Sequence, residues 1–232
     1  MTDILTEGLA QLGLPTGAAP RLAAFADAVL EKNKVMNLTA ITEPADFAAL
    51  HLLDSAALMS IAAFRGKRVI DVGTGAGFPG VPLRILEPDF DLTLLDSLGK
   101  RVDFLREACA ELGLERVTAV HARAEEFASA HREQYDIAVS RAVAELNVLC
   151  ELVLPLVKVG GCFLAMKSVG SNGEIDRARG AAGQLGGRIR GTRDYTIPGT
   201  DVMHRVVLID KLRPTPQTYP RPFARIKKNP LQ

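Results

Sequence analysis

Apolar residues in the N-terminal part of the chain are spaced as in amphipathic helices. Two sets repeat at intervals of three and four: Leu22, Phe25, Ala26, Val29 and Leu30, and then Leu50, Leu53, Ala57, Ile61 and Phe64. Between them, residues 33–42 predict an ordered loop, and Pro44 indicates the start of a new helix. The pattern predicts a helical cap over residues 1–65.

From residue 68 onward, short apolar runs alternate with helical stretches, of which residues 100–112 are the clearest. The runs typical of buried strands are Arg68–Val72, Leu92–Asp96, Val117–His121, Ile137–Ser140, Cys162–Met166, Arg188–Tyr195 and His204–Asp210. Such alternation favours a parallel sheet with right-handed crossovers and helices on both faces. The last two strands are joined only by a short loop at Pro198-Gly199, so one of them must run antiparallel. We therefore predict an α/β, Rossmann-like domain over residues 66–211, with a mostly parallel seven-stranded sheet and a C-terminal antiparallel hairpin.

Residues 212–232 form a basic, proline-rich tail that we expect to be extended. From residue 211 to the end there are six basic residues and no acidic one, although the net charge of the whole chain is only +1. Such a tail can bind phosphate backbones, but a solvated tail without a partner is equally common. The candidates for contact with RNA are Arg221, Arg225, Lys227 and Lys228.

Composition indicates an ordinary globular protein, with 47% hydrophobic and 24% charged residues. Cys109, Cys150 and Cys162 lie in apolar runs without metal-binding spacing, so we expect buried thiols and no metal. No apolar stretch is long enough for a membrane span, and Asp3 and Glu7 argue against a signal peptide. These features predict a soluble, cytoplasmic protein that we expect to be a monomer.

A glycine-rich turn follows the first strand. Read literally, Gly75-Ala-Gly-Phe-Pro-Gly80 matches the dinucleotide-binding fingerprint, and Asp96 follows about 20 residues later. Two features argue against a pyrophosphate. Asp71 would repel it, and Pro79 and Pro82 remove backbone N–H donors at the helix start that would hold it.

S-adenosylmethionine fits this turn better, because it carries a sulfonium and a ribose diol but no phosphate. Gly73, Gly75 and Gly77 would allow close approach of the backbone, and Asp96 would accept the ribose hydroxyls. The alternative for Asp96 is to cap the following helix. At the tips of the next two strands, residues 122–126 could contact an adenine ring, and Arg141 either faces a ligand or pairs with a carboxylate.

Several blocks of the chain resemble one known family. They are residues 71–83 (DVGTGAGFPGVPL), Asn33-Lys34 with Asn37-Leu38-Thr39, His51 to Ser55, Leu95 to Leu98 with Lys100-Arg101, Arg123 to Glu125, and Ser140 to Val143. In this order they are similar to the bacterial small-subunit ribosomal RNA guanine-N7 methyltransferases, the family of glucose-inhibited division protein B. One departure is Lys32, where the family usually has an aromatic residue.

The resemblance implies a class I methyltransferase domain with an N-terminal helical cap. It implies transfer of a methyl group from S-adenosylmethionine to N7 of one guanosine, conventionally numbered 527, in the 530 loop of 16S rRNA, with 16S rRNA or the 30S particle as partner. S-adenosylhomocysteine would be the product. The implied cofactor contacts are Gly73, Phe78, Ala124, Glu125 and Arg141.

Guanine N7 has a free lone pair, so this reaction needs no general base, and we assign no catalytic residue. Arg141 is a possible substrate contact. We expect the four histidines to have structural or surface roles, although His51 lies in one of the blocks that resemble the family. Three other functions remain open: a methyltransferase with a different acceptor, an NAD-dependent oxidoreductase, and a non-catalytic RNA-binding protein that kept a cofactor pocket.

Overall fold

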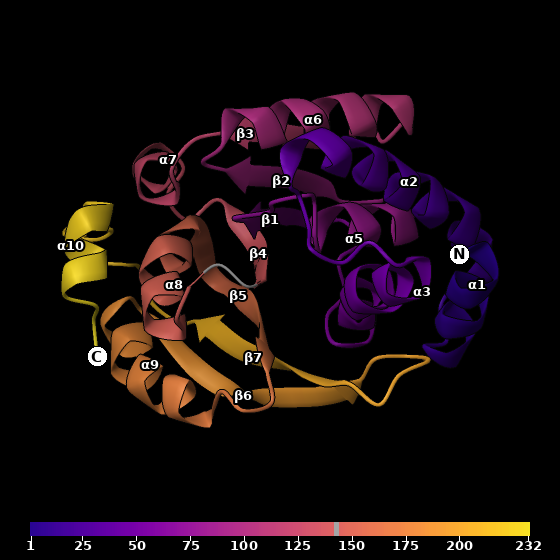
Figure 1. The fold of residues 1–232 in the computed structure, drawn as a ribbon. Helices are drawn as coiled ribbons and strands as arrows, with labels where there is room; N and C mark the ends of the chain where they lie inside the picture. The colour runs from indigo at the N-terminus through magenta and orange to yellow at the C-terminus, as the bar shows by residue number, and fades with distance from the viewer. Residues whose placement is uncertain (142–143) are drawn as a thin grey trace.

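Seven strands form one central sheet in the computed structural model, which describes residues 1–141 and 144–232 (Figure 1). Their order is β3-β2-β1-β4-β5-β7-β6. The strands are β1 (Arg68–Val72), β2 (Asp91–Asp96), β3 (Val117–His121), β4 (Tyr135–Arg141), β5 (Val157–Ser168), β6 (Gly187–Thr196) and β7 (Met203–Lys211). The pairs among β1 to β5 are parallel, whereas β7 runs antiparallel to both β5 and β6. The predicted fold class, with its C-terminal antiparallel hairpin, is confirmed.

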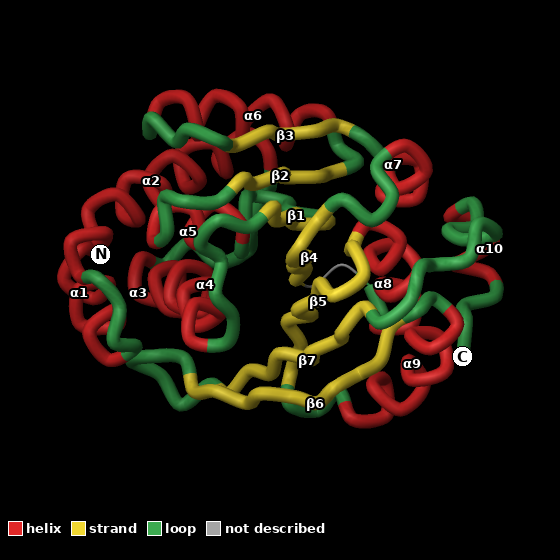
Figure 2. Tube along the Cα trace, turned by 180° about the vertical axis from the view of Figure 1, so that it is seen from behind, coloured by secondary structure: helices red, strands yellow, loops and turns green. Residues whose placement is uncertain are grey.

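Helices cover both faces of this sheet, as Figures 1 and 2 show from opposite sides. One face carries α5 (Gly80–Leu86), α6 (Gly99–Glu111) and the N-terminal helices. The other face carries α7 (Ala124–Ala130), α8 (Leu146–Val153), α9 (Asn172–Gln184) and the short C-terminal α10 (Phe223–Lys228). Each face therefore has its own apolar core, and the ends of the strands stay accessible between the two layers.

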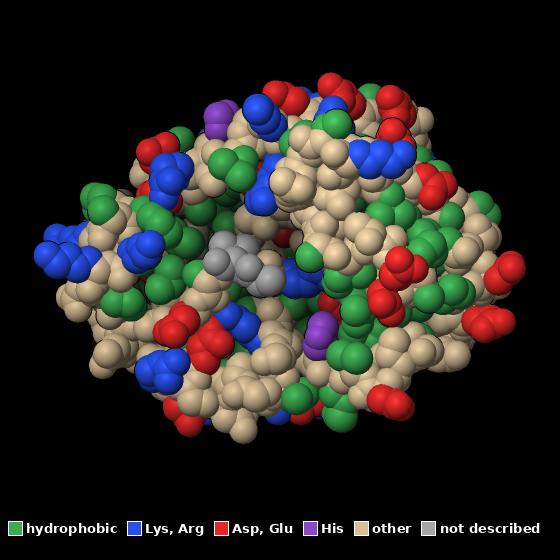
Figure 3. Space-filling view, viewed as in Figure 1, with side chains coloured by type: hydrophobic (Ala, Val, Ile, Leu, Met, Phe, Trp, Pro, Cys, Tyr) green, Lys and Arg blue, Asp and Glu red, His purple; other side chains and the backbone are tan. Residues whose placement is uncertain are grey.

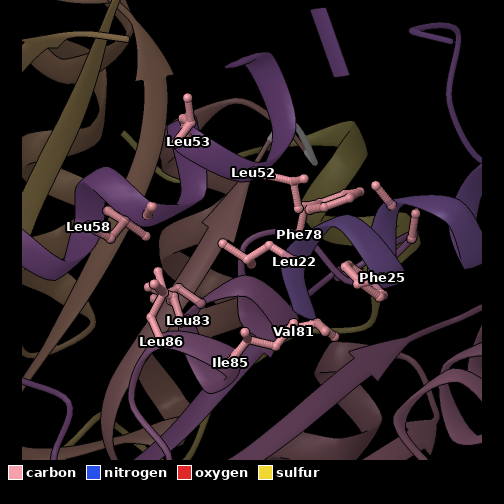
Figure 4. Close-up of a cluster of buried hydrophobic side chains, with 14 of the residues drawn as sticks. Leu22, Phe25, Leu52, Leu53, Leu58, Phe78, Val81, Leu83, Ile85 and Leu86 are labelled. Atoms are coloured by element: carbon pink, nitrogen blue, oxygen red, sulfur yellow. The ribbon is translucent and has the colours of Figure 1, made fainter. Parts of the chain in front are cut away.

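The N-terminal helices pack into the core of the sheet domain. They are α1 (Thr2–Gln11), α2 (Ala19–Met36), α3 (Pro44–Phe47) and α4 (Asp54–Ala56), with short helical turns at 16–18, 48–53 and 57–60. Leu22 and Phe25 of α2 belong to the same buried cluster as Phe78 and Val81 from the glycine turn and α5 (Figure 4). Burial of this shared apolar surface fixes the cap against the glycine turn and α5.

Helix α2 runs four residues further than the sequence pattern predicts, because the side chain of Asn33 stabilises its end. The Oδ1 of Asn33 accepts hydrogen bonds from the backbone N–H groups of Leu38 and Thr39, and its Nδ2 donates to the carbonyl of Thr39. Asn37 then ends the helix in the left-handed conformation, with a φ of 51°. The expected ordered loop is thus present but shorter, and its shape is set by Asn33.

The expectation of an extended tail is wrong for residues 223–228, which form α10. Pro222 precedes the helix, and Ile226 is fully buried against the second core. Arg221 pairs with the buried Glu151 of α8 at 2.6 Å. The prolines predicted an extended chain, but the burial of Ile226 and the ion pair between Arg221 and Glu151 hold this segment on the domain.

Burial raises the pKa of the Cys109 thiol to about 11 and of the Cys150 thiol to about 12, so both remain protonated. Within residues 1–141 and 144–232, no helix has both the length and the apolar character needed to cross a bilayer.

Candidate functional site

The candidate site lies at the carboxyl ends of β1, β2, β3 and β4. The chain order reverses between β1 and β4, since β2 and β3 lie on one side of β1 and β4 to β7 lie on the other. Open α/β sheets bind ligands in the crevice at such a switch point. The predicted residues at the strand tips therefore lie along one edge of the sheet. The face shown in Figure 3 is hollowed near its middle.

The glycine turn that follows β1 is tied to the end of β2. The N–H groups of Gly73 and Thr74 donate to the carbonyl of Leu95 at 2.8 and 3.1 Å. Gly73, Gly75 and Gly77 have φ values of 72°, 60° and 102°, a region that favours glycine. A Cβ on Gly75 would point into open space, whereas one on Gly77 would come within 3.0 Å of Leu105, Val81 and Phe25. Gly75 thus keeps a cradle open for a ligand, and Gly77 permits close packing beneath it.

Asp96, at the end of β2, holds the glycine turn in register. Its Oδ2 accepts a hydrogen bond from the N–H of Gly75 and its Oδ1 accepts one from the N–H of Leu98, both at 2.9 Å. The guanidinium of Arg101 lies 3.7 Å away. The carboxylate also lines a cavity, so it supports the loop before α6 and faces the predicted ligand space at the same time.

Four of the predicted cofactor residues come together around this cavity, which we call the nucleoside cavity. Its lining consists of Val72, Gly73, Leu95, Asp96, Ser97, Ala122, Arg123, Ala124, Glu125, Leu152 and Phe223. It combines apolar walls with one carboxylate at the tip of β2, which is the combination that a nucleoside requires.

Phe78 and Arg141 lie on the other side of β1, and the side chain of Phe78 is buried in the interface with the cap (Figure 4). The imidazole of His51 stacks on its ring at 4.7 Å between centroids, and the Arg141 guanidinium lies 5.2 Å from the ring centroid. Phe78 therefore joins the glycine turn to the cap and to the tip of β4.

Arg141 ties the cap to the sheet through a buried carboxylate. Its Nη1 donates to Asp54 Oδ2 at 3.1 Å and to the carbonyl of Leu50 at 2.9 Å. Oδ1 of Asp54 accepts hydrogen bonds from the hydroxyl of Tyr195 on β6 and from Nδ1 of His204 on β7, at 2.7 and 2.8 Å. Burial alone would raise the pKa of Asp54, but His204 and Arg141 hold it below its ordinary value.

His51 extends this network toward the loop that follows α2. Burial and the charge of Arg141 lower the pKa of His51 to about 4, so its imidazole is neutral near pH 7. Arg141 Nη2 donates to Nδ1 at 2.8 Å, which places the ring proton on Nε2, and Nε2–H donates to the hydroxyl of Thr39 at 2.8 Å. His51 thus links the cap loop to Arg141.

A second cavity, which we call the cap cavity, lies beside Arg141 between the cap and the sheet. Its lining consists of Ile41, Leu50, His51, Asp54, Arg141, Met166, Lys167, Ser168, Val202 and His204. The nucleoside cavity lies at the ends of β1, β2 and β3 and the cap cavity at β4, β5 and β7, so the two lie on either side of the switch point between β1 and β4. Because neighbouring strands are about 4.8 Å apart, an elongated ligand at the tip of β1 could reach both.

Asp71 was expected to face the ligand, but its side chain is fully buried inside the glycine turn. Its Oδ2 accepts hydrogen bonds from the Thr74 hydroxyl at 2.7 Å and from the Gly80 N–H at 2.9 Å. Burial raises its pKa to about 6. Asp71 therefore fastens the start of α5 to the turn, and any repulsion of an anion acts through the protein rather than by contact.

The four predicted RNA-binding residues separate into two kinds. Arg225, Lys227 and Lys228 are exposed on α10, and basic side chains gather in this region of the surface in Figure 3. The side chain of Arg221 is only 10% exposed and forms two hydrogen bonds with Glu151. Arg221 therefore anchors the segment that carries the other three.

The sequence pattern did not indicate the site contacts of three residues: Phe223 and His204, which line these cavities, and Tyr195, which donates a hydrogen bond to Asp54. Tyr195 and Asp54 are 141 positions apart, and His204 and Asp54 are 150 apart, so no local spacing could reveal the contacts. Ala142 and Val143 of the Ser140 to Val143 block lie outside the described residues. Among the residues that are described, no group of three or more histidine, cysteine, aspartate and glutamate residues could hold a metal ion.

A family model described as "GidB: rRNA small subunit methyltransferase G" matches residues 18–188. The chain belongs to this family. It is 45% identical over 234 residues to the ribosomal RNA small subunit methyltransferase G of Alkaliphilus metalliredigens, which covers 99% of this chain and 98% of that protein. The protein of the same name from Symbiobacterium thermophilum is 46% identical over 238 residues, covering 98% and 97%.

Solved structures confirm the fold. The structure of TYW2 from M. jannaschii in complex with AdoMet matches with a TM-score of 0.56 and 14% identity over 69% of this chain and 76% of that one. TrmN from Thermus thermophilus matches with a TM-score of 0.54 and 24% identity, over 68% and 48%. At these identities the likeness shows the class I methyltransferase fold and nothing finer.

Proposed function

We propose that this protein transfers a methyl group from S-adenosylmethionine to N7 of one guanosine in the 530 loop of 16S rRNA, leaving S-adenosylhomocysteine. The observation that carries the proposal is the nucleoside cavity at the topological switch point, lined by Asp96 and adjoining the glycine turn. Membership of the family named for rRNA small subunit methylation supports rRNA as the acceptor.

The residues present fit S-adenosylmethionine. Gly75 leaves open space where a Cβ would stand, and Asp96 presents a carboxylate for a ribose diol. A diphosphate fits poorly, because α5 begins behind Pro79 and has Pro82 in its first turn, and neither residue has an N–H to donate. Gly73, Asp96, Ala124 and Glu125 would hold the nucleoside half, whereas Arg141 lies where the amino acid half would reach toward β4.

S-adenosylmethionine supplies an electrophilic methyl group on a positively charged sulfur. Guanine N7 already has a lone pair in the plane of the ring, so no side chain has to remove a proton from it. The residues of the chain act by orientation: the Asp54–Arg141–His51 network fixes the tip of β4 against the cap. Correct positioning of two reactants can lower a barrier by about 7–11 kcal/mol.

The cap cavity is the proposed site of the acceptor base. Leu50, Met166 and Val202 give it apolar walls, and Arg141 offers N–H donors suited to O6 of guanine. A base can enter it only when unstacked, which favours a loop over a helix, because the major groove of A-form RNA hides N7.

We expect purified protein to place one labelled methyl group on 16S rRNA from cells that lack this gene. Naked rRNA and 30S particles are compared as substrates, and digestion with mass spectrometry identifies the nucleoside. A single 7-methylguanosine in the 530 loop supports the proposal. Label in another nucleoside, in protein or in a small molecule would instead establish a methyltransferase with a different acceptor. Gly75→Asn, which tolerates positive φ but fills the cradle, is the matched inactive control.

The exposed basic residues of α10 are proposed to contact RNA phosphates. Replacing Arg225, Lys227 and Lys228 with glutamine should reduce the slope of log K against log salt by about 2, because each contact to single-stranded RNA contributes about 0.7. Binding of a 530-loop RNA at several salt concentrations measures this slope. Replacing Arg106, Arg179 and Arg190, which are exposed elsewhere, is the control, and equal slopes for both triple variants would refute the role of α10.

A further inference from the structure

The C-terminal segment reaches the nucleoside cavity. Phe223, the first residue of α10, lines this cavity together with Gly73, Asp96 and Ala124, although it lies about 100 to 150 positions further along the chain than the lining residues from the strand tips. The glycine turn and the strand tips form one side of the cavity, and Phe223 and Leu152 of α8 form another. Without the C-terminal segment, the cavity would be open on this side.

A contact with Arg123 orients Phe223. The guanidinium of Arg123 lies 4.6 Å from the centroid of its ring, within the range of a cation–π interaction. The same guanidinium pairs with Glu125 at 2.7 Å, and both residues line the cavity. The aromatic ring is thus joined to the residues that follow β3.

The segment that carries Phe223 is anchored on both sides of it. Before it, Arg221 donates three hydrogen bonds to Glu151, from its backbone N–H and from two guanidinium nitrogens, at 2.6 to 2.9 Å. Arg132 Nη1 donates to the carbonyl of Tyr219 at 2.6 Å. After it, Ile226 is fully buried. Phe223 is therefore held in place by the docked segment and does not depend on a bound ligand for its position.

We infer that the docked C-terminal segment completes the cofactor site, with Phe223 as the apolar wall of the subsite for the adenine ring. The ligand group expected here is a flat aromatic purine. Contact with an aromatic side chain and exclusion of water both favour its binding. This inference rests on the proposed function in one respect, namely that the cofactor contains adenosine.

The consequence is a coupling between two parts of the site. Phe223 shares α10 with Arg225, Lys227 and Lys228, so the helix that is proposed to contact RNA also closes the cofactor pocket. A ligand that binds only when the segment is docked must stabilise the docked state. S-adenosylhomocysteine should therefore protect α10 against opening, in the absence of any RNA.

Calorimetric titration with S-adenosylhomocysteine tests directly whether Phe223 contributes to cofactor binding. Phe223→Ala should weaken binding about tenfold and Phe223→Leu about threefold, with little change in the midpoint of thermal unfolding. Asn229→Ala, at an exposed position directly after the same helix, is the matched control and should bind as the native chain does. Equal affinity of Phe223→Ala and Asn229→Ala would overturn the inference.

Limited trypsin digestion supplies a second readout. Cleavage after Arg225, Lys227 or Lys228 requires the segment to open, and saturating S-adenosylhomocysteine should slow it at least tenfold in the native chain. An unchanged cleavage rate would overturn the inference. If the native chain binds S-adenosylhomocysteine and Phe223→Ala binds equally well, only this inference fails; if the native chain does not bind it at all, the proposed function fails.

Discussion

Replacement of Arg141 with methionine should lower the free energy of unfolding by about 3–5 kcal/mol, the cost of removing one partner from a buried ion pair. The carboxylate of Asp54 is fully buried and would lose the guanidinium that now lies 3.1 Å away. Methionine has a side chain of similar length, so the loss of unfolding free energy comes mainly from removal of the charge and less from a new cavity. Urea unfolding monitored by circular dichroism measures it.

A second replacement separates charge from packing. In the double variant Arg141→Met with Asp54→Asn, no buried carboxylate remains without its guanidinium, so at least half of the lost stability should return. Arg106→Met on the exposed side of α6 is the control and should cost less than about 1 kcal/mol. If the single and double variants are equally unstable, the pair does not couple the cap to the sheet.

The same variants test whether Arg141 also serves the reaction. We expect the double variant to regain stability but not methyl transfer, because the guanidinium proposed to face the acceptor base and the amino acid part of the cofactor is still missing. Recovery of both would make Arg141 only a structural residue. Single-turnover methylation of 16S rRNA at saturating cofactor measures this step.

Much of the fold could be predicted from the sequence because the signals are local. Each predicted strand overlaps an observed one, since a run of apolar residues bounded by polar ones is read within about ten positions. The antiparallel hairpin followed from the short Pro198-Gly199 loop, which leaves no room for a crossover helix. Helix α1 lies within the predicted cap of residues 1–65, but it was not predicted as a separate element, because the apolar spacing was recognised only from Leu22 onward.

Only some of the site residues could be predicted from the sequence. The residues that were missed have partners that lie far away along the chain. Gly73, Asp96, Ala124 and Glu125 come together because parallel strands bring their tips to one edge of a sheet. The partners of Asp54 on β6 and β7, and the position of Phe223, depend on packing between segments more than 70 residues apart, for which the sequence alone contains no spacing signal. The tail was misjudged for the same reason, since Glu151, which anchors Arg221, is on α8.

The role of Asp71 in the structure differs from the role that its position in the sequence predicted. Its position before the glycines indicated a carboxylate that faces the ligand, yet it is enclosed by the turn that it stabilises. Among the described residues, its Oδ1 has no hydrogen-bond partner. An ionised carboxylate in this position is costly, and burial therefore raises its pKa to about 6, despite the hydrogen bonds from Thr74 and Gly80.

Asp71→Asn should accordingly gain stability relative to the native chain as the pH rises. The native-state pKa of about 6 lies above the unfolded value near 4, so the folded chain binds the proton more tightly between these values. The native chain therefore loses stability as pH rises through this window, by about 3 kcal/mol in total for about two pKa units. Asparagine keeps an oxygen that accepts from Thr74 and Gly80 but does not titrate.

The quantity to measure is the difference in unfolding free energy between Asp71→Asn and the native chain, from urea unfolding at pH 4, 5, 6, 7 and 8. It should rise by about 3 kcal/mol in favour of the variant between pH 4 and 7 and then level off. All other titrating groups are common to both proteins and cancel in this difference. Asp103→Asn, at an exposed position of α6, provides the comparison and should change the free energy of unfolding by less than about 1 kcal/mol. A flat profile for Asp71→Asn would mean that the carboxylate inside the turn is not destabilised by burial, and the two prolines alone would then argue against a diphosphate at the glycine turn.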